Sequence, residues 1–266
     1  KGIPTFIPHS SYLNEQHAPQ SGYIANNRFL ESFDMIRNYI EYRSRDLTSE
    51  EVTRAKTFAQ SLLSYDQKKT LKMIYKKNDF EKPITPNVNK IFAYIKKHRK
   101  LDKNIHFYKI DFLKKVKANL LRIFRHYLSK KFFEKCSDVL PNNKFVYFPM
   151  HFQPEASTLV NGVWYTNQIS LIENLSKSLP LGYTLVVKEH PRGRGVRPLW
   201  QYRHIASLHN VQFSDLDSKV ILSKCKAVIT ISGSIGLEAL ALKRPVIMLG
   251  RTFHSFNTVY YRAKNF

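Results

Sequence analysis

A short apolar run that leads into a small-residue turn decides the fold of this chain: Ala227-Val228-Ile229-Thr230-Ile231-Ser232-Gly233-Ser234-Ile235-Gly236-Leu237-Glu238-Ala239-Leu240. The β-branched residues predict a buried strand of a parallel sheet, and residues 237–242 predict the first turns of a helix. A second apolar run at residues 244–250 completes a strand–helix–strand unit. The sequence therefore predicts an α/β fold with a parallel sheet.

The turn between this strand and this helix is rich in groups that suit a phosphate. Ser232, Gly233, Ser234 and Gly236 permit a tight turn that aims backbone N–H groups and two hydroxyls at one point. A helix N-terminus adds partial positive charge and unpaired donors. Glu238, one turn further, can accept hydrogen bonds from a ribose diol. The spacing is neither the dinucleotide fingerprint nor a P-loop. Such a turn also occurs in α/β domains without a ligand, so both interpretations stay open.

A second apolar run, at residues 182–187, ends in a polar loop that contains Lys188, His190 and Arg192. Ligands of open α/β sheets bind beyond the carboxyl ends of the strands. These three side chains are therefore predicted to meet the phosphate. Pro191 disfavours helical geometry at His190 and holds it extended at the strand end. The alternative is a structural histidine flanked by two solvated cations.

A third apolar run, at residues 144–150, is followed by a loop that contains Glu155. A carboxylate that faces cationic phosphate-binding groups can act as a base or nucleophile at a sugar carbon. Alternatively, Glu155 caps the next helix or pairs with Lys188 or Arg192, and the spacing alone favours this structural role. Residues 164–179 repeat apolar side chains at a helical period.

These motifs resemble those of bacterial capsule polysaccharide biosynthesis proteins. The matching stretches are Lys188-Glu189-His190-Pro191, the serine motif at residues 232–240, and Pro245-Val246-Ile247. The family includes the Kdo transferases that build capsule lipid anchors, and it shares its His-Pro and serine motifs with bacterial sialyltransferases. The resemblance covers residues 144–261, whereas residues 1–140 match loosely. It implies a GT-B fold, in which two Rossmann-like domains with helices on both sheet faces border a cleft.

The resemblance also implies roles for single residues. His190 matches the His-Pro histidine and would contact the donor phosphate. Ser232 and Ser234 match the serine motif and would bind the same phosphate, together with the Gly233 and Ser234 amides. Glu238 matches a glutamate that contacts the ribose in many GT-B enzymes.

The loop at residues 153–157 resembles a loop with Asp-Ala-Ser in the Kdo transferases. This match places Glu155 at the candidate catalytic carboxylate, although the residue is Glu rather than Asp. The implied mechanism needs no metal and no cofactor. His190 and the serine motif would neutralise charge on the leaving phosphate, while Glu155 would serve the sugar carbon or the acceptor hydroxyl.

The implied activity is that of a glycosyltransferase of capsule, lipopolysaccharide or related surface polysaccharide synthesis. Its donor would be a nucleotide sugar, either CMP-Kdo or a similar compound or a UDP-sugar. Its acceptor would be the growing polysaccharide or a lipid-linked precursor. Two alternatives remain, namely a nucleotide-sugar epimerase of the same fold and a non-catalytic component that binds glycan or nucleotide.

The chain has 43 Lys and Arg but only 20 Asp and Glu, which gives a formal net charge of +23. Such an excess of positive charge indicates a polyanionic partner. Residues 111–128 form a predicted basic amphipathic helix, which can lie on an anionic membrane or pack its apolar face on the domain. Its apolar positions are Leu113, Val116, Leu120, Phe124 and Tyr127. Because capsule acceptors are lipid-linked, we expect a cytoplasmic protein at the inner face of the cell membrane. Nucleic-acid binding is not expected, since no RRM, zinc-finger or helix-turn-helix motif is present.

The predicted boundary lies at residues 141–143. Residues 1–140 would hold the remainder of an N-terminal Rossmann-like half plus the basic helical region, and residues 141–266 the C-terminal nucleotide-sugar-binding domain. Helices are predicted at residues 29–42, 49–64 and 66–77. The missing initiator Met and the end soon after a strand predict a fragment. Two cysteines, Cys136 and Cys225, suit a reducing compartment, and no membrane-spanning run, signal peptide or metal-ligand spacing is visible.

Overall fold

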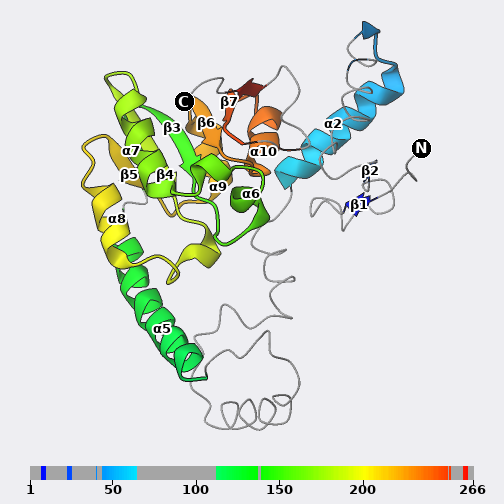
Figure 1. Ribbon diagram of the computed structural model, residues 1–266. Helices are drawn as coiled ribbons and strands as arrows, with labels where there is room; N and C mark the ends of the chain where they lie inside the picture. The colour runs from blue at the N-terminus through cyan, green and yellow to red at the C-terminus, as the bar shows by residue number, and fades with distance from the viewer. Residues whose placement is uncertain are drawn as a thin grey trace, which may run out of the picture.

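The computed structural model describes residues 44–64, 112–136 and 139–250, together with residues 7–9, 23–25, 40, 252 and 260–262 (Figure 1). The predicted helices at residues 29–42 and 66–77 lie outside the described residues, apart from residue 40. Near the N-terminus, β1 (Ile7–His9) pairs antiparallel with β2 (Tyr23–Ala25).

The centre of the described structure is a six-stranded sheet with the strand order β5-β4-β3-β6-β7-β8. All neighbouring strands of this sheet are parallel. The strands are β3 (Lys144–Pro149), β4 (Tyr183–Lys188), β5 (Val211–Phe213), β6 (Ala227–Thr230), β7 (Val246–Met248) and β8 (Tyr260–Arg262). The prediction of an α/β fold with a parallel sheet is confirmed.

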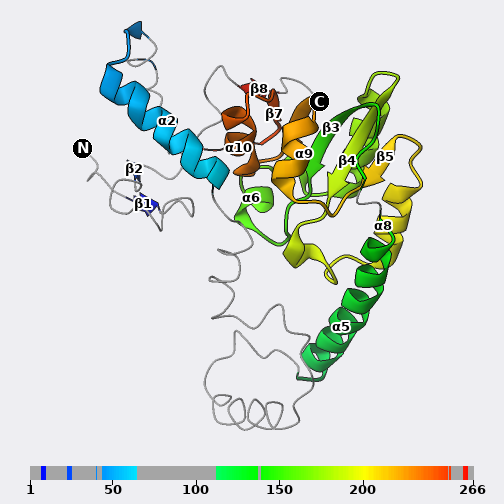
Figure 2. The same ribbon diagram turned by 180° about the vertical axis from the view of Figure 1, so that it is seen from behind.

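The chain changes direction across the sheet between β3 and β6. It first runs from β3 outward to β4 and β5, and then returns to β6 and continues to β7 and β8. Helices α7 (Gln168–Ser178) and α8 (Leu199–Ala206) cover one face, whereas α9 (Ser218–Lys224) and α10 (Ile235–Ala241) cover the other (Figures 1 and 2). The Rossmann-like arrangement with helices on both faces is therefore present. The second domain of a GT-B pair, and the boundary at residues 141–143, stay predictions.

Both faces of the sheet are buried, and the strand side chains alternate between them. On the α7–α8 face, Phe148 and Leu185 pack in one core. On the α9–α10 face, Tyr147 and Val186 pack in a second core with Ile221 of α9. This alternation decides which face each side chain reaches at the strand ends.

Two longer helices attach to this domain from opposite sides. The C-terminal part of α5 (Phe112–Glu134) packs on α8 and β5, where the Phe133 ring lies 5.1 Å from Tyr202 and 5.5 Å from Phe213. The N-terminal part of α5 projects away from the sheet (Figure 1). Helix α2 (Ser49–Ser64) has the predicted bounds and packs its C-terminal end on α10. Among the described residues, no helix is long and apolar enough to cross a membrane.

Some elements differ from the predictions or were not predicted. The expected helix at residues 164–179 is a short 3-10 turn, η3 (Val163–Tyr165), followed by α7, because the Asn167 side chain accepts from the Ser170 N–H and begins a new helix. The basic helix predicted at residues 111–128 starts one residue later, at Phe112, and extends to Glu134. Elements α8, β5 and α9 have no counterpart in the sequence-based interpretation.

Candidate functional site

The carboxyl ends of β4, β3 and β6 are neighbours in the sheet, and they flank the point where the strand order reverses. Such a switch point is where open α/β sheets bind ligands. The predicted His-Pro loop follows β4 and the serine loop follows β6, so the structure brings these two motifs to one edge. Between them lies His151, which directly follows β3 and is 7% exposed. Its Nε2 accepts from the Ser232 N–H at 3.4 Å.

The serine loop uses two of its donors inside the protein. The Ser232 hydroxyl donates to the Ser157 carbonyl at 2.7 Å, and the Gly233 N–H donates to the Thr230 hydroxyl at 3.1 Å. The sequence-based view had given both donors to the phosphate. Ser234, in contrast, is exposed at the start of α10, and its side chain makes no capping hydrogen bond. Ser234 is therefore the residue of the motif whose hydroxyl is open to a ligand.

The turn at position 233 has room for a side chain only if a neighbouring atom shifts. A Cβ atom there would lie 3.0 Å from the Thr230 hydroxyl and 3.1 Å from His151 Nε2. Such distances are tighter than ordinary van der Waals contact. The glycine thus lets the serine loop pass close to the histidine of the neighbouring strand end.

His190 stands at the end of β4 in an extended conformation, with φ −61° and ψ 134°, as Pro191 predicted. It precedes the 3-10 turn η4 (Pro191–Gly193), and its Nδ1 accepts from the Arg192 N–H at 3.2 Å. In the neutral ring the proton therefore sits on Nε2. Burial, aided by the charges of Arg192 and Arg197, lowers the pKa of His190 to about 4. The ring is thus a neutral N–H donor at pH 7.

Arg192 lies over an aromatic ring that the sequence did not single out. Its guanidinium carbon is 4.5 Å from the centroid of Phe152, and the Phe152 ring lies 5.9 Å from the ring of His190. A cation over an aromatic face is attracted to it and is held in place. Phe152, on the loop that follows β3, therefore fixes Arg192 beside His190.

Lys188 and Glu238 lie together on the α9–α10 face. The Lys188 Nζ donates to the Leu216 carbonyl at 2.6 Å and to the Ser218 hydroxyl at 3.2 Å, so it holds the loop before α9. Glu238 is buried, and burial raises its pKa to about 7, while Lys219 and Lys188 oppose the rise. Lys188 thus has a structural role in this fold, and its predicted phosphate contact stays a prediction.

Glu155 is exposed and immediately precedes the short helix α6 (Ala156–Leu159). Its carboxylate accepts from the Ser157 hydroxyl at 3.0 Å, and its carbonyl accepts from the Thr158 and Leu159 N–H groups. These are the contacts of the helix-capping alternative. Because the Ser157 carbonyl also binds Ser232, the Glu155 loop is tied to the serine loop.

A buried ion pair that the sequence analysis missed lies beneath these loops. Glu189 accepts from Arg197 Nη1 at 3.0 and 3.1 Å, from the Tyr202 hydroxyl at 2.8 Å, and from the His190 N–H at 2.7 Å. Arg197 Nη2 also donates to the His151 carbonyl at 2.9 Å. The one available signal was alternation, since Leu185, Val187 and Glu189 share the buried face, where an acid needs a partner.

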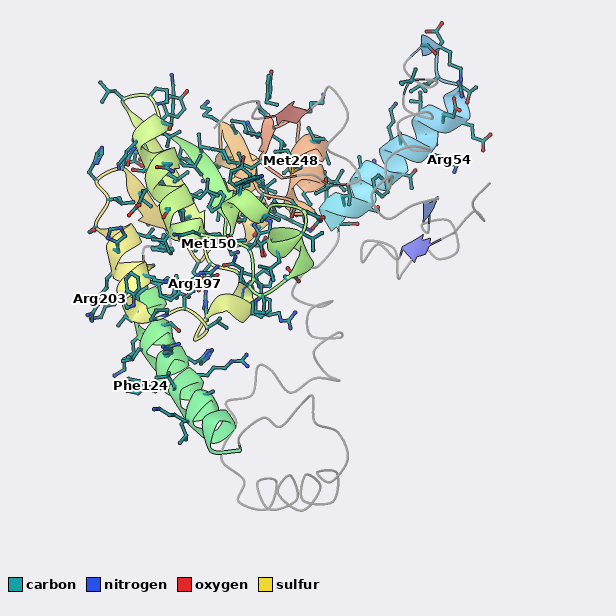
Figure 3. All side chains as sticks on the ribbon, in the orientation of Figure 1. Arg54, Phe124, Met150, Arg197, Arg203 and Met248 are labelled. Atoms are coloured by element: carbon teal, nitrogen blue, oxygen red, sulfur yellow. The ribbon has the colours of Figure 1, made fainter. Side chains whose placement is uncertain are left out.

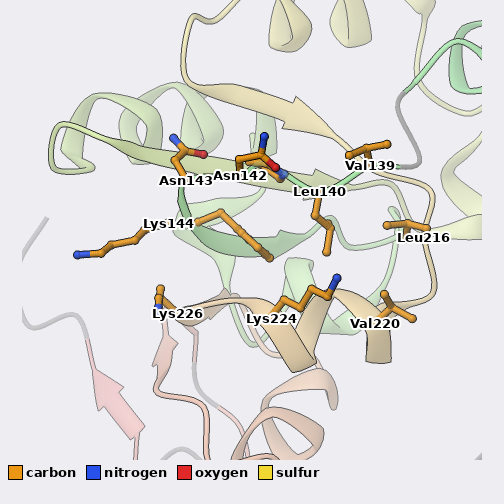
Figure 4. Close-up of a pocket in the computed structure, with 11 residues that line it drawn as sticks. Val139, Leu140, Asn142, Asn143, Lys144, Leu216, Val220, Lys224 and Lys226 are labelled. Atoms are coloured by element: carbon orange, nitrogen blue, oxygen red, sulfur yellow. The ribbon is translucent and has the colours of Figure 1, made fainter.

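A cavity of about 750 Å³ lies elsewhere, alongside α9 and the amino-terminal end of β3 (Figure 4). Its lining includes Leu140, Leu216 and Val220 on the apolar side, with Lys224 and Lys226 at its rim. His190 and Ser234 are at the opposite end of the strands, so this cavity is not the predicted phosphate site. Among the described residues no cluster of three or more His, Cys, Asp or Glu could hold a metal ion.

Comparison with known proteins identifies the family. The family model described as capsule polysaccharide biosynthesis protein matches residues 46–263 of the 266 residues. The chain belongs to this family, as the motifs predicted. The match begins well before residue 144, where the resemblance was expected to start, and so includes α2 and α5. No curated protein matches the chain.

Several solved structures are similar to parts of the chain. The beta Kdo 2,7 transferase KpsC of Thermosulfurimonas dismutans is 16% identical over 58% of this chain and 47% of its own, with a TM-score of 0.40. The UDP-GlcNAc 2-epimerase of Neisseria meningitidis, bound to UDP-GlcNAc, is 21% identical over 51% of this chain and 37% of its own, with a TM-score of 0.31. Anabaena HepE, in complex with UDP-glucose, is 19% identical over 48% and 33%, with a TM-score of 0.30. The chain spans about half or less of these proteins, and at these TM-scores the similarities carry no argument about activity.

Proposed function

We propose that this member of the capsule polysaccharide biosynthesis family is a metal-independent glycosyltransferase that binds the phosphate of a nucleotide sugar between the β4 and β6 ends. The observation that carries the proposal is the state of His190. Its Nδ1 is occupied by the Arg192 N–H, so the Nε2 proton is left to donate. His151 joins the His190 side of the site to the serine loop through Ser232. The donor class is CMP-Kdo or a similar compound, or a UDP-sugar.

The proposed chemistry rests on donors arranged before the reaction starts. As the sugar leaves, negative charge grows on the phosphate, and prearranged donors lower the barrier in a site that excludes water. His190 Nε2, the Arg192 guanidinium and the Ser234 hydroxyl are these donors. Glu238 is proposed to bind the ribose, because its poorly compensated carboxylate gains from hydroxyl donors. The low pKa of His190 rises when a negatively charged phosphate binds beside it.

Glu155 is the proposed catalytic carboxylate, which serves the sugar carbon or the acceptor hydroxyl. Its side chain is exposed, so substrate can reach it, and its loop is anchored to the serine loop through Ser157. The acceptor is proposed to be the growing polysaccharide or its lipid-linked precursor.

A panel of nucleotides and nucleotide sugars tests the proposal. A ligand of the folded state raises the melting temperature, and a concentration of 100 times Kd stabilises by about 2.7 kcal/mol. We expect one of the CMP, UDP or GDP series to raise it. Turnover that needs an acceptor then supports a transferase, whereas an epimer formed without acceptor supports the epimerase alternative. Binding without any turnover supports a non-catalytic component.

We also propose that α5 contacts an anionic membrane surface at the cytoplasmic face. Leu120, Phe124 and Tyr127 lie on one stripe and are 57%, 59% and 53% exposed, so these side chains do not pack on the domain (Figure 3 labels Phe124). The same helix carries exposed Lys130 and Lys131. Apolar side chains flanked by lysines suit the headgroup region of an anionic bilayer.

A further inference from the structure

The three strand ends of the site are joined by one set of buried polar contacts, which we call the strand-end network: Tyr202, Glu189, Arg197, His151 and Gln168. Arg197, which is labelled in Figure 3, stands at its centre. One of its guanidinium nitrogens holds Glu189 of the β4 end, and the other holds the His151 carbonyl of the β3 end. A single side chain thus bridges two of the three loops.

The network continues from the β3 end to the β6 end. Gln168 fixes the backbone of His151 on both sides, because its Oε1 accepts from the His151 N–H at 2.7 Å and its Nε2 donates to the His151 carbonyl at 2.9 Å. With its backbone held, the His151 ring accepts from the Ser232 N–H. The position of the serine loop therefore depends on the same contacts that position His151.

On the other side, the network sets the conformation of the His-Pro loop. Glu189 accepts from the His190 N–H, and the Tyr202 hydroxyl donates to Glu189 and also lies 3.3 Å from the Gly193 carbonyl. A Cβ atom on Gly193 would lie 2.2 Å from Glu189 Oε1, so the loop closes directly over the carboxylate. All the groups that contact this carboxylate donate to it, which favours its ionised form although burial raises its pKa.

We infer that Arg197 is a positioning residue, which sets the spacing between His190 and the serine loop without touching the nucleotide sugar. This inference rests on the proposed function. Neither Arg197 nor Glu189 reaches the surface of the site, since their side chains are 8% and 0% exposed. A buried ion pair is weak support for stability, because an apolar pair of the same volume often serves as well. An apolar pair, however, has no guanidinium group whose two nitrogens can bind Glu189 and the His151 carbonyl at the same time.

Replacement of Arg197 by lysine tests the inference. Lysine keeps the charge but has one nitrogen, so it cannot bridge Glu189 and the His151 carbonyl in this geometry. The matched control is Arg203→Lys, on the exposed side of α8. The first readout needs no ligand: the titration of His190 followed by NMR. We expect Arg197→Lys to raise the His190 pKa toward its ordinary value of 6.5, and Arg203→Lys to leave it near 4.

The second readout is the affinity for the nucleotide that stabilises the wild-type protein, measured well below the melting temperature of each variant. We expect Arg197→Lys to weaken it at least tenfold and Arg203→Lys to leave it unchanged. If Arg197→Lys does not fold, Tyr202→Phe and Gly193→Ala disturb the same network without changing its charge, and both should raise the His190 pKa. The titratable or charged groups around His190 are His151, Arg192, Arg197 and Glu189, whose carboxylate accepts from the His190 N–H.

The outcomes separate this inference from the proposed function. An unchanged His190 titration and unchanged affinity in Arg197→Lys would overturn the positioning role, even if the nucleotide binds. A raised His190 pKa in a protein that binds no nucleotide would support the positioning role and refute the proposed function. A lower melting temperature alone, with both readouts unchanged, would make Arg197 a purely structural residue.

Discussion

Two buried glutamates stand near the same edge of the sheet, on opposite faces, and their surroundings differ. Glu189, on the α7–α8 face, is saturated by Arg197, Tyr202 and a backbone amide. Glu238, on the α9–α10 face, has no donor to its carboxylate among the described residues, and nearby lysines act on it only through charge. The comparison separates a carboxylate that holds the structure from one that receives no hydrogen bond from the described residues and that we propose to bind the ribose.

The largest expected effect is a loss of the free energy of unfolding when Arg197, the partner of Glu189, is replaced. Replacement of Glu238 should cause no such loss. Arg197→Met leaves Glu189 buried without its charge partner, which typically costs about 3–5 kcal/mol of the free energy of unfolding. Glu238→Gln removes a poorly compensated charge and should cost less than about 1 kcal/mol at pH 7. Urea denaturation measures both. Equal losses of the free energy of unfolding in the two variants would contradict the proposed difference between the two glutamates.

A third carboxylate, the exposed Glu155, belongs to neither class and is expected to act in the reaction. Glu155→Gln keeps the shape but removes the charge that attacks carbon or accepts a proton, so transfer should fall by about two orders of magnitude or more. Nucleotide-sugar affinity should stay within a few fold. Near-normal turnover together with lower stability would instead leave Glu155 as a helix cap.

The two glutamates should also differ in how they couple stability to pH. The pKa of Glu238 is about 7 in the folded protein against an ordinary value of 4.5. The folded state therefore keeps this proton to higher pH than the unfolded chain does. The stability from this group is fully present below pH 4.5 and is lost as the pH rises through 7.

Glu238→Gln removes this titration. Between pH 5 and pH 8, the stability lost by the wild type relative to the variant should be roughly 1–3 kcal/mol. The buried histidines His151 and His190 have lowered pKa values, which change stability with pH in the opposite direction. Because both proteins contain these histidines, their contribution cancels in the difference between wild type and variant. Parallel stability curves for the two proteins would show that Glu238 is already compensated.

The smallest expected effect concerns α5, outside the site. Binding to vesicles should need anionic lipid and should weaken with salt, because screening shortens the reach of exposed charges. Phe124→Ser removes apolar area and should reduce binding, whereas Phe58→Ser on α2, which is also exposed, should not. Equal binding to neutral vesicles, or none at low salt, would contradict a membrane role.

The sequence predicted the strands that end at the site, because β-branched runs with turn residues are strong local signals. It placed α2 within its observed bounds, and it predicted the extended His190 from Pro191. It did not predict α9 or β5, which have only 7 and 3 residues and give no clear period.

The sequence could not show how donors are shared across the fold. The Ser232 hydroxyl bonds to a carbonyl 75 residues away, and Arg197 reaches back 46 residues to His151. Such pairs depend on which strand ends become neighbours, and no local pattern records that order. The hydrogen bonds that Ser232 and Lys188 make within the protein therefore had to come from the structure.

The most direct test of the central claim is calorimetric titration of His190→Ala and of the exposed control His209→Ala with the nucleotide sugar that stabilises the wild-type protein. Loss of the Nε2 donor to a charged phosphate should weaken binding by roughly 1.5–3 kcal/mol in His190→Ala. The melting temperature without ligand should change little. Affinity in His209→Ala should equal that of the wild type. Wild-type affinity in His190→Ala would contradict the account, because it would remove the donor phosphate from the end of β4.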